Sequence, residues 1–303
     1  MSIKLIKSSL NGYDCYSLVD TPSGSFFSFL PELGCCLNEL EFSGKKILRN
    51  IDPDNFDEMV HQSYNGAQLF PFPNRLAKGS YLWNGMNYSF DLNDKGRPNA
   101  LHGILTRKKF EIMESQEKGR VSAKYSYRHD DTCYPFDLDI INDFVLGENF
   151  LEIGTRISNV GEETAPVAHG WHPYFNGLDS VNKCSLLLPD VDQLQLDASL
   201  IPTGESKRFD DFADLKLIGG AEFDSCFYVG AGDLEFENSK ENFRLQLSSS
   251  QYPFMQVFIP PTRDCIAIEP QTCAPDAFNN LNGLIELQAG GIAIFSFKIQ
   301  LSE

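Results

Sequence analysis

The sequence predicts an all-β protein built from antiparallel sheets, arranged as a sandwich or a barrel-like structure. Three observations support this prediction. Short stretches of alternating polar and apolar residues recur along the chain, turn-forming residues separate them, and helical periodicity is weak throughout. Many short strands joined by frequent turns are typical of sandwiches and barrels rather than of folds with parallel sheets.

The predicted elements follow one another along the chain. Residues 1–7 alternate as a strand does, and the best helix candidate is one short segment at 54–62. Residues 151–158 alternate with a period of two, 159–162 indicate a turn, and 164–171 are expected to form the next strand. Further turns are expected at 230–233 and 237–240, and Gly290-Gly291 precedes a closing strand at 292–301.

The length and composition are those of one globular domain spanning residues 1–303. Antiparallel β folds reach this length without dividing, and the sequence contains no linker, low-complexity tract or fixed-period repeat. Hydrophobic residues make up 42% of the chain and charged residues 22%, which is too apolar for a disordered protein. A chain of this size can bury a large core, so it needs no disulfide or metal to fold.

The charge of the chain narrows the classes of partner. A formal net charge of −17 repels phosphate backbones and anionic lipids, so we expect neither nucleic-acid binding nor membrane binding. The same charge disfavours phosphorylated substrates, although a local cluster of arginines could override it. No apolar run approaches the length of a membrane span.

The cysteines indicate reduced thiols. None of the eight belongs to a CxxC pair, and no histidine lies near them at metal-ligand spacing, so we expect no metal site. The N-terminal residues show no apolar signal segment, which favours a cytoplasmic protein.

Three segments interrupt the strand pattern with dense polar and turn-forming residues, and they are the candidates for chemistry. They lie about two hundred residues apart at the extremes, so only the tertiary fold could bring them together. The segments are Pro71–Leu76 with Asn99–Gly103, then His169–Gly177, then Cys265–Gln271.

Glu269 lies on the face of a predicted strand that also carries Ala267 and Cys265, whereas Ile266 and Ile268 lie on the other face. Small neighbours leave space in front of the carboxylate, as a ligand cavity requires. The alternative is a glutamate at a strand end that points to solvent or pairs with an arginine.

The other candidates also have two interpretations. His172 shares a face with Gly170, and a histidine at such a place is either a structural residue or part of a site, as is His102. Arg75 either anchors its proline-rich loop or binds sugar hydroxyls or carboxylates with its planar guanidinium. Asp224 either makes turn hydrogen bonds or contacts a ligand.

These segments together resemble the aldose 1-epimerase (galactose mutarotase-like) family. Pro73-Asn74-Arg75 with Asn99-Ala100-Leu101-His102-Gly103 is similar to the paired N-terminal signature of that family. Gly170-Trp171-His172-Pro173-Tyr174-Phe175 is similar to the segment with the catalytic histidine, and Ile268-Glu269-Pro270 to the strand with the catalytic glutamate. Phe223-Asp224 resembles the position of a sugar-binding aspartate. Order and spacing match over roughly residues 20 to 300.

The resemblance implies a large antiparallel β-sandwich, a supersandwich, with an open sugar-binding cleft and no cofactor. It implies that Glu269 is the general base, that His172 is the general acid, and that His102 assists at the ring-oxygen side. Arg75, Asn74 and Asp224 would bind sugar hydroxyls. His169 is a second candidate for the acid, but His172 directly precedes Pro173-Tyr174-Phe175, as in the family segment.

The implied reaction interconverts the α and β anomers of a free aldose such as glucose or galactose. A carboxylate would take the proton of the C1 hydroxyl while an imidazolium protonates the ring oxygen. Because a nearby carboxylate favours the charged imidazole, we expect the pKa of His172 to lie above its ordinary value. Trp171 and Tyr174 are candidates to stack on the sugar, whereas Phe175 is expected in the core.

Two other functions compete with this one. A hexose-6-phosphate 1-epimerase would need further arginines or lysines at the cleft, and Arg75 is the one obvious cleft arginine in the sequence. A non-catalytic carbohydrate-binding protein would be favoured if the glutamate or the histidine were missing, and both are present. The sequence leaves open whether the protein is a monomer or a homodimer.

Overall fold

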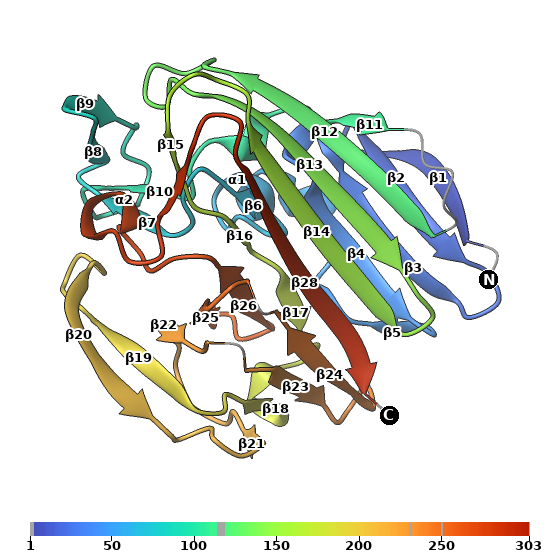
Figure 1. The fold of residues 1–303 in the computed structure, drawn as a ribbon. Coiled ribbons are helices and arrows are strands. Elements are labelled where there is room, and N and C mark those ends of the chain that lie inside the picture. The colour runs from blue at the N-terminus through green and yellow to red at the C-terminus, as the bar shows by residue number, and fades with distance from the viewer. Residues whose placement is uncertain (1–2, 114–118, 231, 250, 303) are drawn as a thin grey trace.

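Three antiparallel sheets dominate the fold (Figure 1). The computed structural model describes residues 3–113, 119–230, 232–249 and 251–302. The all-β prediction is confirmed, because every pairing between named strands of the described residues is antiparallel.

The N-terminal sheet has five strands that follow one another in sequence order, each turning back on the last. It is drawn in blue in Figure 1. Its strands are β1 (Ile3–Leu10), β2 (Tyr13–Asp20), β3 (Ser25–Leu30), β4 (Cys36–Phe42) and β5 (Lys45–Lys46).

The largest sheet has nine strands and runs through the middle of the molecule (Figure 1). The C-terminal strand lies at its centre, between strands from the first and second halves of the chain. In spatial order the strands are β11 (Glu111–Met113), β12 (Arg120–Arg128), β13 (Asp137–Leu146), β14 (Phe150–Asn159), β28 (Ile292–Ser302), β24 (Phe243–Ser248), β23 (Leu234–Asn238), β18 (Cys184–Leu187) and β21 (Lys216–Leu217).

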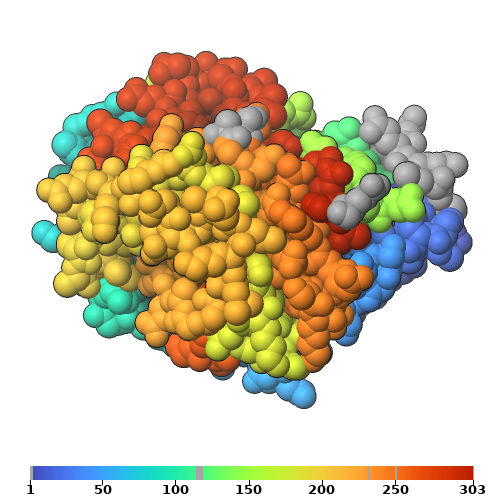
Figure 2. Space-filling model, turned by 90° about the horizontal axis from the view of Figure 1, so that it is seen from below, coloured from blue at the N-terminus to red at the C-terminus, as the bar shows by residue number. Residues whose placement is uncertain are grey.

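The third sheet has eight strands and contains most of the predicted site segments. Seven strands form one path, and β17 (Tyr174–Asn176) pairs beside it with β26. Along the path the strands are β20 (Pro202–Phe209), β19 (Val191–Leu196), β22 (Asp224–Tyr228), β25 (Phe254–Phe258), β26 (Cys265–Gln271), β16 (Gly170–Trp171) and β6 (Gln68–Leu69). Seen from below in Figure 2, yellow and orange segments from the second half of the chain form much of the surface.

The remaining elements are short. Three strand pairs connect the sheets: β7 (Arg75–Ala77) with β10 (Asn99–Leu101), β8 (Ser80–Trp83) with β9 (Met86–Ser89), and β15 (Ala165–Val167) with β27 (Ile285–Leu287). The helices are α1 (Phe56–His61) and α2 (Ala277–Asn280), with 3-10 turns at Pro31–Leu33, Pro53–Asn55, Leu105–Arg107 and Val181–Lys183. No helix of the described residues is long and apolar enough to cross a membrane.

The core lies on the inner face of the nine-stranded sheet. Along β13 every second residue is buried, as period-two alternation requires. The buried Phe144 ring packs on Phe29 of the N-terminal sheet, with ring centroids 4.5 Å apart. Further along the same sheet Phe236 packs on Phe175 of β17 at 6.0 Å. The nine-stranded sheet therefore packs against both other sheets, which makes a sandwich of extended size (Figure 1).

Most predicted elements are found. Strand β1 covers the described part of the segment expected at 1–7, whose residues 1 and 2 lie outside the described residues. Strands β14 and β28 occupy the segments expected at 151–158 and 292–301, and α1 is the one short helix expected at 54–62. The turn at 159–162 follows β14. Residue 231 lies outside the described residues, and the turn expected at 237–240 begins only after β23 ends at Asn238.

The single strand expected over 164–171 is wrong. The chain forms β15, leaves it at Ala168 and His169, and then forms β16 in a different sheet. All residues from 165 to 171 are buried, so no change in burial marks the point where the partner strand changes from β27 to β26.

Candidate active site

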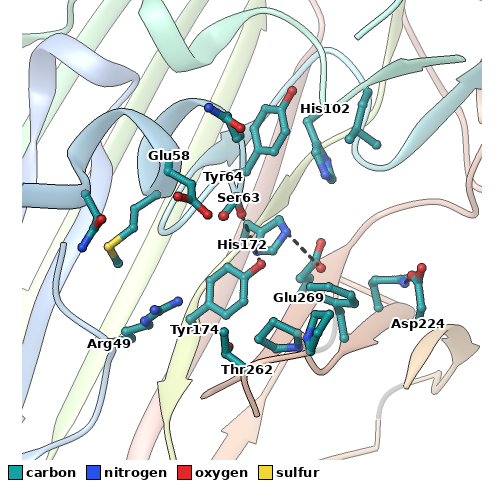
Figure 3. A pocket seen from close by; sticks show the side chains of 18 of the residues that line it. Arg49, Glu58, Ser63, Tyr64, His102, His172, Tyr174, Asp224, Thr262 and Glu269 are labelled. Atoms are coloured by element: carbon teal, nitrogen blue, oxygen red, sulfur yellow. Dashed lines mark hydrogen bonds and ion pairs between the residues drawn. The ribbon is translucent and has the colours of Figure 1, made fainter. Parts of the chain in front are cut away.

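A cavity of about 710 Å³ lies over one face of the eight-stranded sheet (Figure 3). Six of the seven predicted site residues line it. They are Asn74, Arg75, His102, His172, Asp224 and Glu269. Segments almost two hundred residues apart in sequence therefore meet in one place.

His172, between β16 and β17, lies opposite Glu269 of β26. Gly170 pairs with Gln271 and Tyr174 pairs with Ala267, so the same antiparallel register places His172 across from Glu269. The His172 Nε2 atom is 3.3 Å from the Glu269 Oε1 atom. Alternation along β26 directs Ile266 and Ile268 into the main core and Glu269 into the cavity, as the sequence predicted.

Both members of the pair are buried, with side chains 6% and 2% exposed. Burial raises the pKa of Glu269 well above its ordinary value, and the neighbouring charge of Asp224 adds to this. Burial also lowers the pKa of His172 to about 3. The expectation of a raised His172 pKa is therefore wrong, because removing the imidazole from water outweighs the attraction of the carboxylate.

The two groups can share one proton. The lowered pKa of His172 and the raised pKa of Glu269 both favour the uncharged pair, a carboxylic acid beside a neutral imidazole. Transfer of that one proton to the imidazole gives a carboxylate and an imidazolium without any exchange with solvent. The pair can thus present one acid and one base to a bound ligand.

His102 lies beside His172, with ring centroids 5.3 Å apart. Its Nδ1 atom accepts the backbone N–H of Asn74 at 3.1 Å, so in the neutral ring the proton is on Nε2. Burial, together with the charges of His172 and Arg75, lowers the pKa of His102 well below its ordinary value. His102 therefore offers a neutral N–H donor to the cavity.

The backbone near His102 requires glycine at the next position. Gly103 has φ +70° and bridges to Phe70, and a Cβ there would lie 2.0 Å from the Phe70 carbonyl oxygen. The strands β7 and β10 pair Arg75 with Leu101, which brings the two parts of the N-terminal signature together.

Arg75 is anchored, as one of its two interpretations expects, and it also lines the cavity. Sugar binding by Arg75 stays a prediction. Its Nε atom donates to Asp94 Oδ2 at 3.0 Å, and Asp94 is almost fully buried. Its Nη1 atom donates to Asn74 Oδ1 at 3.1 Å. These contacts fix the plane of the guanidinium.

Gln256 is a site residue that the sequence analysis missed. It pairs with Glu269 across β25 and β26, and it lines the cavity. Its Oε1 atom accepts from Asn74 Nδ2 at 3.1 Å, and its Nε2 atom donates to Asp224 Oδ1 at 2.9 Å. The available signal was one amide within the otherwise apolar run of β25, Phe-Met-Gln-Val-Phe.

Trp171 is not in the cavity, and its prediction as a sugar contact is wrong. Its side chain is fully buried, 6.2 Å from Phe144 and 5.8 Å from His169 between ring centroids. The physical reason is the alternation of β16, which directs Trp171 away from the face that carries His172. His169 is also fully buried, and its ring nitrogens form hydrogen bonds with Tyr252 and Gln68, so it is not the cavity histidine.

The other aromatic residues near His172 lie either at the cavity or in the core. Tyr174 lines the cavity and stacks on His172, with ring centroids 4.8 Å apart. Phe175 is fully buried in the core, as expected. Tyr64, for which the sequence carries no signal, lines the cavity next to His102.

All eight cysteines are free thiols, and seven of them are buried. Among the described residues, no group of three or more His, Cys, Asp or Glu side chains is arranged to hold a metal ion.

Comparison with known sequences identifies the family. A profile described as aldose 1-epimerase matches residues 21–300, almost the whole chain. The chain belongs to the aldose 1-epimerase family. The family supports isomerase chemistry on a sugar, and the described fold is the fold of its members.

The sequence relatives are distant. An uncharacterized protein of Escherichia coli, YihR, is 28% identical over 285 residues, which are 90% of this chain and 89% of that protein. Bovine galactose mutarotase is 28% identical over 188 residues, which cover 57% of this chain and 52% of that enzyme.

Solved structures share the fold along its whole length. A galactose mutarotase-like protein from Clostridium acetobutylicum superposes with a TM-score of 0.89 at 18% identity, covering 100% of this chain and 99% of that one. The GalM/aldose epimerase homologue from C. elegans gives a TM-score of 0.83 at 20% identity, covering 99% of each chain. At such identities the similarity shows the fold alone.

Proposed function

We propose that this protein is an aldose 1-epimerase that interconverts the α and β anomers of a free aldose such as glucose or galactose. The observation that supports this most is the His172–Glu269 pair, with 3.3 Å between Nε2 and Oε1, at the wall of a polar cavity. Family membership supports the same reaction.

In the proposed mechanism, Glu269 acts as a carboxylate after its shared proton has moved to His172. It removes the proton of the C1 hydroxyl, the C1–O1 bond becomes a carbonyl, and the C1–O5 bond breaks. The electron pair of that bond goes to O5, which takes a proton from the His172 imidazolium. Rotation about C1–C2 and the reverse steps close the ring with the other configuration.

The neighbouring residues would position the sugar. His102 would donate its Nε2–H at the ring-oxygen side, while Arg75 and Asp224 would bind hydroxyl groups. Asn74 is engaged with Arg75 and Gln256, so its part in substrate binding is to hold these two side chains in place.

A hexose 6-phosphate is less well supported as substrate. The two arginines that line the cavity are each paired with an aspartate, Arg75 with Asp94 and Arg49 with Asp264 at 2.9 Å. Besides Glu269, the cavity carries three further acidic side chains, at Asp52, Glu58 and Asp224. A phosphate would meet repulsion there that a neutral sugar does not.

A non-catalytic sugar-binding protein would not need the pair that this cavity contains. Burial of an acid and an imidazole in contact costs stability, and binding a neutral sugar does not require it. A cytoplasmic location is part of the proposal and is supported by the free thiols. Whether the protein is a monomer or a homodimer stays open.

The test is the rate of anomer exchange at equilibrium, measured by NMR exchange between the two anomeric protons of glucose and of galactose. Wild-type protein should accelerate exchange, and Glu269→Gln and His172→Asn should each lower the rate by at least about 100-fold. Matched controls are Glu286→Gln and His129→Asn, which change an exposed glutamate and an exposed histidine.

Several outcomes would contradict the proposal. If wild type exchanges glucose 6-phosphate but no free aldose, the phosphorylated sugar is the substrate. If it binds glucose without accelerating exchange, the protein is a carbohydrate-binding protein. If both variants keep full activity, the acid and base have been assigned wrongly.

A further inference from the structure

The residues that line the cavity extend beyond His172 and Glu269, and we call the part that they line the second lobe. We define the second lobe by six lining residues, Arg49, Asn50, Asp52, Asn55, Glu58 and Thr262. They come from the segment that runs through the 3-10 turn Pro53–Asn55 into α1, and from the loop between β25 and β26. Figure 3 shows Arg49 and Glu58 at the opposite end of the cavity from Asp224 and His102.

The size of the cavity exceeds the needs of one sugar ring. Pockets for drug-sized ligands span roughly 300–1,000 Å³, and this one measures about 710 Å³. A hexose has only twelve non-hydrogen atoms. A single ring held by Glu269, His172 and Arg75 would therefore leave the second lobe to solvent or to a further part of the substrate.

The lining of the second lobe suits sugar hydroxyls. Its asparagine, threonine and carboxylate side chains offer both donors and acceptors. Its one arginine is already paired, because Arg49 Nη2 lies 2.9 Å from Asp264 Oδ2. With Asp52 and Glu58 also present, the lobe is acidic and favours a neutral group over an anionic one.

The order of residues along the cavity indicates which substituent of the ring enters the second lobe. In Figure 3, Asp224 and Glu269 lie on the right, His172 and Tyr174 near the middle, and Glu58 and Arg49 on the left. Glu269 faces O1 and His172 faces O5 in the proposed mechanism. The direction from Glu269 past His172 thus continues along the ring from C1 and O5 to C5, which carries C6.

We infer that the second lobe binds a second, neutral sugar ring attached through O6, so that the substrate class includes reducing disaccharides with a 1→6 linkage. This inference rests on the proposed function, since the orientation of the reducing ring follows from the roles of Glu269 and His172. Tyr174, which stacks on His172 and lines the cavity between the two lobes, would contact the linkage.

The experiment compares isomaltose, gentiobiose, maltose and glucose by NMR exchange between anomers at equilibrium. Isomaltose and gentiobiose carry the second ring on O6, whereas maltose carries it on O4. We expect KM for at least one O6-linked sugar to be about fivefold to tenfold below KM for glucose, which corresponds to one or two added hydrogen bonds. Maltose should show no such gain.

A pair of variants on α1 tests whether the second lobe causes the difference. Glu58→Ala removes a lining carboxylate at a helical position where alanine is favourable. It should raise KM for the O6-linked sugar at least fivefold more than KM for glucose. Asp57→Ala is the matched control, because Asp57 is exposed on the same helix and does not line the cavity.

The outcomes separate this inference from the proposed function. If glucose exchange is catalysed but neither O6-linked disaccharide has a lower KM, the inference is overturned and the epimerase proposal stands. A KM advantage for maltose instead would show that the ring lies in another orientation. If no sugar exchanges faster than without protein, the proposed function fails first.

Discussion

The Arg75 guanidinium is held by the buried carboxylate of Asp94, with 3.0 Å between Nε and Oδ2 and with side chains 12% and 5% exposed. Asp94 does not line the cavity that contains His172 and Glu269, whereas Arg75 does. The same Asp94 Oδ2 accepts from Asn99 at 3.0 Å, within the second half of the N-terminal signature. Asp94 thus connects both halves of that signature behind the cavity wall.

We predict that Asp94 positions Arg75 for sugar binding. Asp94→Ala should raise KM for glucose about tenfold, because a charge-assisted hydrogen bond of roughly 1.5–3 kcal/mol no longer orients the guanidinium. Asp94→Asn keeps an oxygen that can accept from Nε and should show a smaller increase. Steady-state exchange rates over a range of glucose concentrations separate KM from kcat.

The control for Asp94 is Asp91→Ala, which removes an exposed carboxylate nearby in the sequence. A merely structural role of Asp94 would lower the melting temperature in both Asp94 variants without changing KM. That result would show that Asp94 does not position Arg75 for sugar binding.

A second prediction concerns stability and Glu269. Burial raises the pKa of Glu269 in the folded protein, whereas the unfolded chain keeps a value of about 4.3. Between these pKa values the unfolded chain has lost a proton that the folded chain retains, so the free energy of unfolding falls as pH rises. Glu269→Gln cannot ionise and should therefore be more stable than wild type at pH 7.

Urea unfolding at pH 4, 5, 6 and 7 tests this prediction. The advantage of Glu269→Gln should be small at pH 4 and grow with pH, while Glu286→Gln should follow wild type. The lowered pKa of His172 acts in the opposite sense, since it costs stability as pH falls from about 6.5 toward about 3. A variant less stable than wild type at pH 7 would show that the folded protein prefers the ionised carboxylate.

The pH dependence of activity forms a third prediction. The competent pair holds one proton, and it keeps that proton from the lowered pKa of His172, about 3, up to the raised pKa of Glu269. We therefore expect kcat/KM to show no inflection near pH 6.5, where an exposed histidine would titrate. It should fall only at stronger acidity, or above the raised pKa of Glu269.

Anomer exchange measured from pH 4.5 to 8, after subtraction of the rate without protein, provides the measurement. A tenfold loss of kcat/KM between pH 6 and 7 in either direction would mean that His172 titrates near its ordinary value. The pair would then carry full charges in the free protein.

The fourth prediction is that Trp171 contributes to stability and not to sugar binding. Because its indole is fully buried against Phe144 and His169, Trp171→Phe should lower the free energy of unfolding by roughly 1–3 kcal/mol through the space it leaves. Its kcat and KM for glucose should stay within twofold of wild type. Urea unfolding and exchange rates on the same samples measure both effects.

Trp83→Phe is the matched control for Trp171, because Trp83 is the second tryptophan of the chain and lies in β8, away from the cavity. A large rise in KM for Trp171→Phe with unchanged stability would restore Trp171 as a sugar contact.

Much of the fold and most of the cavity residues could be predicted from the sequence. Alternation of side chains is a local property of an extended chain. It predicted that the side chain of Glu269 points to the other face of its strand from Ile266 and Ile268. It also predicted that His172 points to the other face from His169 and Trp171. The same local property contradicts a sugar contact for Trp171, which shares the buried face of His169. The prediction followed from the aromatic ring alone, because sugar rings stack on aromatic side chains.

The pKa of His172 could not be predicted from the sequence, because it depends on burial. A neighbouring carboxylate and removal from water shift an imidazole in opposite directions, and only the depth of the site shows which is larger. The contacts of Gln256 are equally non-local, since its amide joins Asn74 to Asp224 from a third part of the chain.

The sequence by itself determined which side chains of each strand share a face, since backbone geometry alternates them residue by residue. Only the tertiary structure decided which strands lie side by side. The register of β26 with β16 and β17 on one edge and with β25 on the other places Glu269 between His172 and Gln256. That register depends on the packing of sheets whose strands come from distant segments, and no local pattern in β26 contains it.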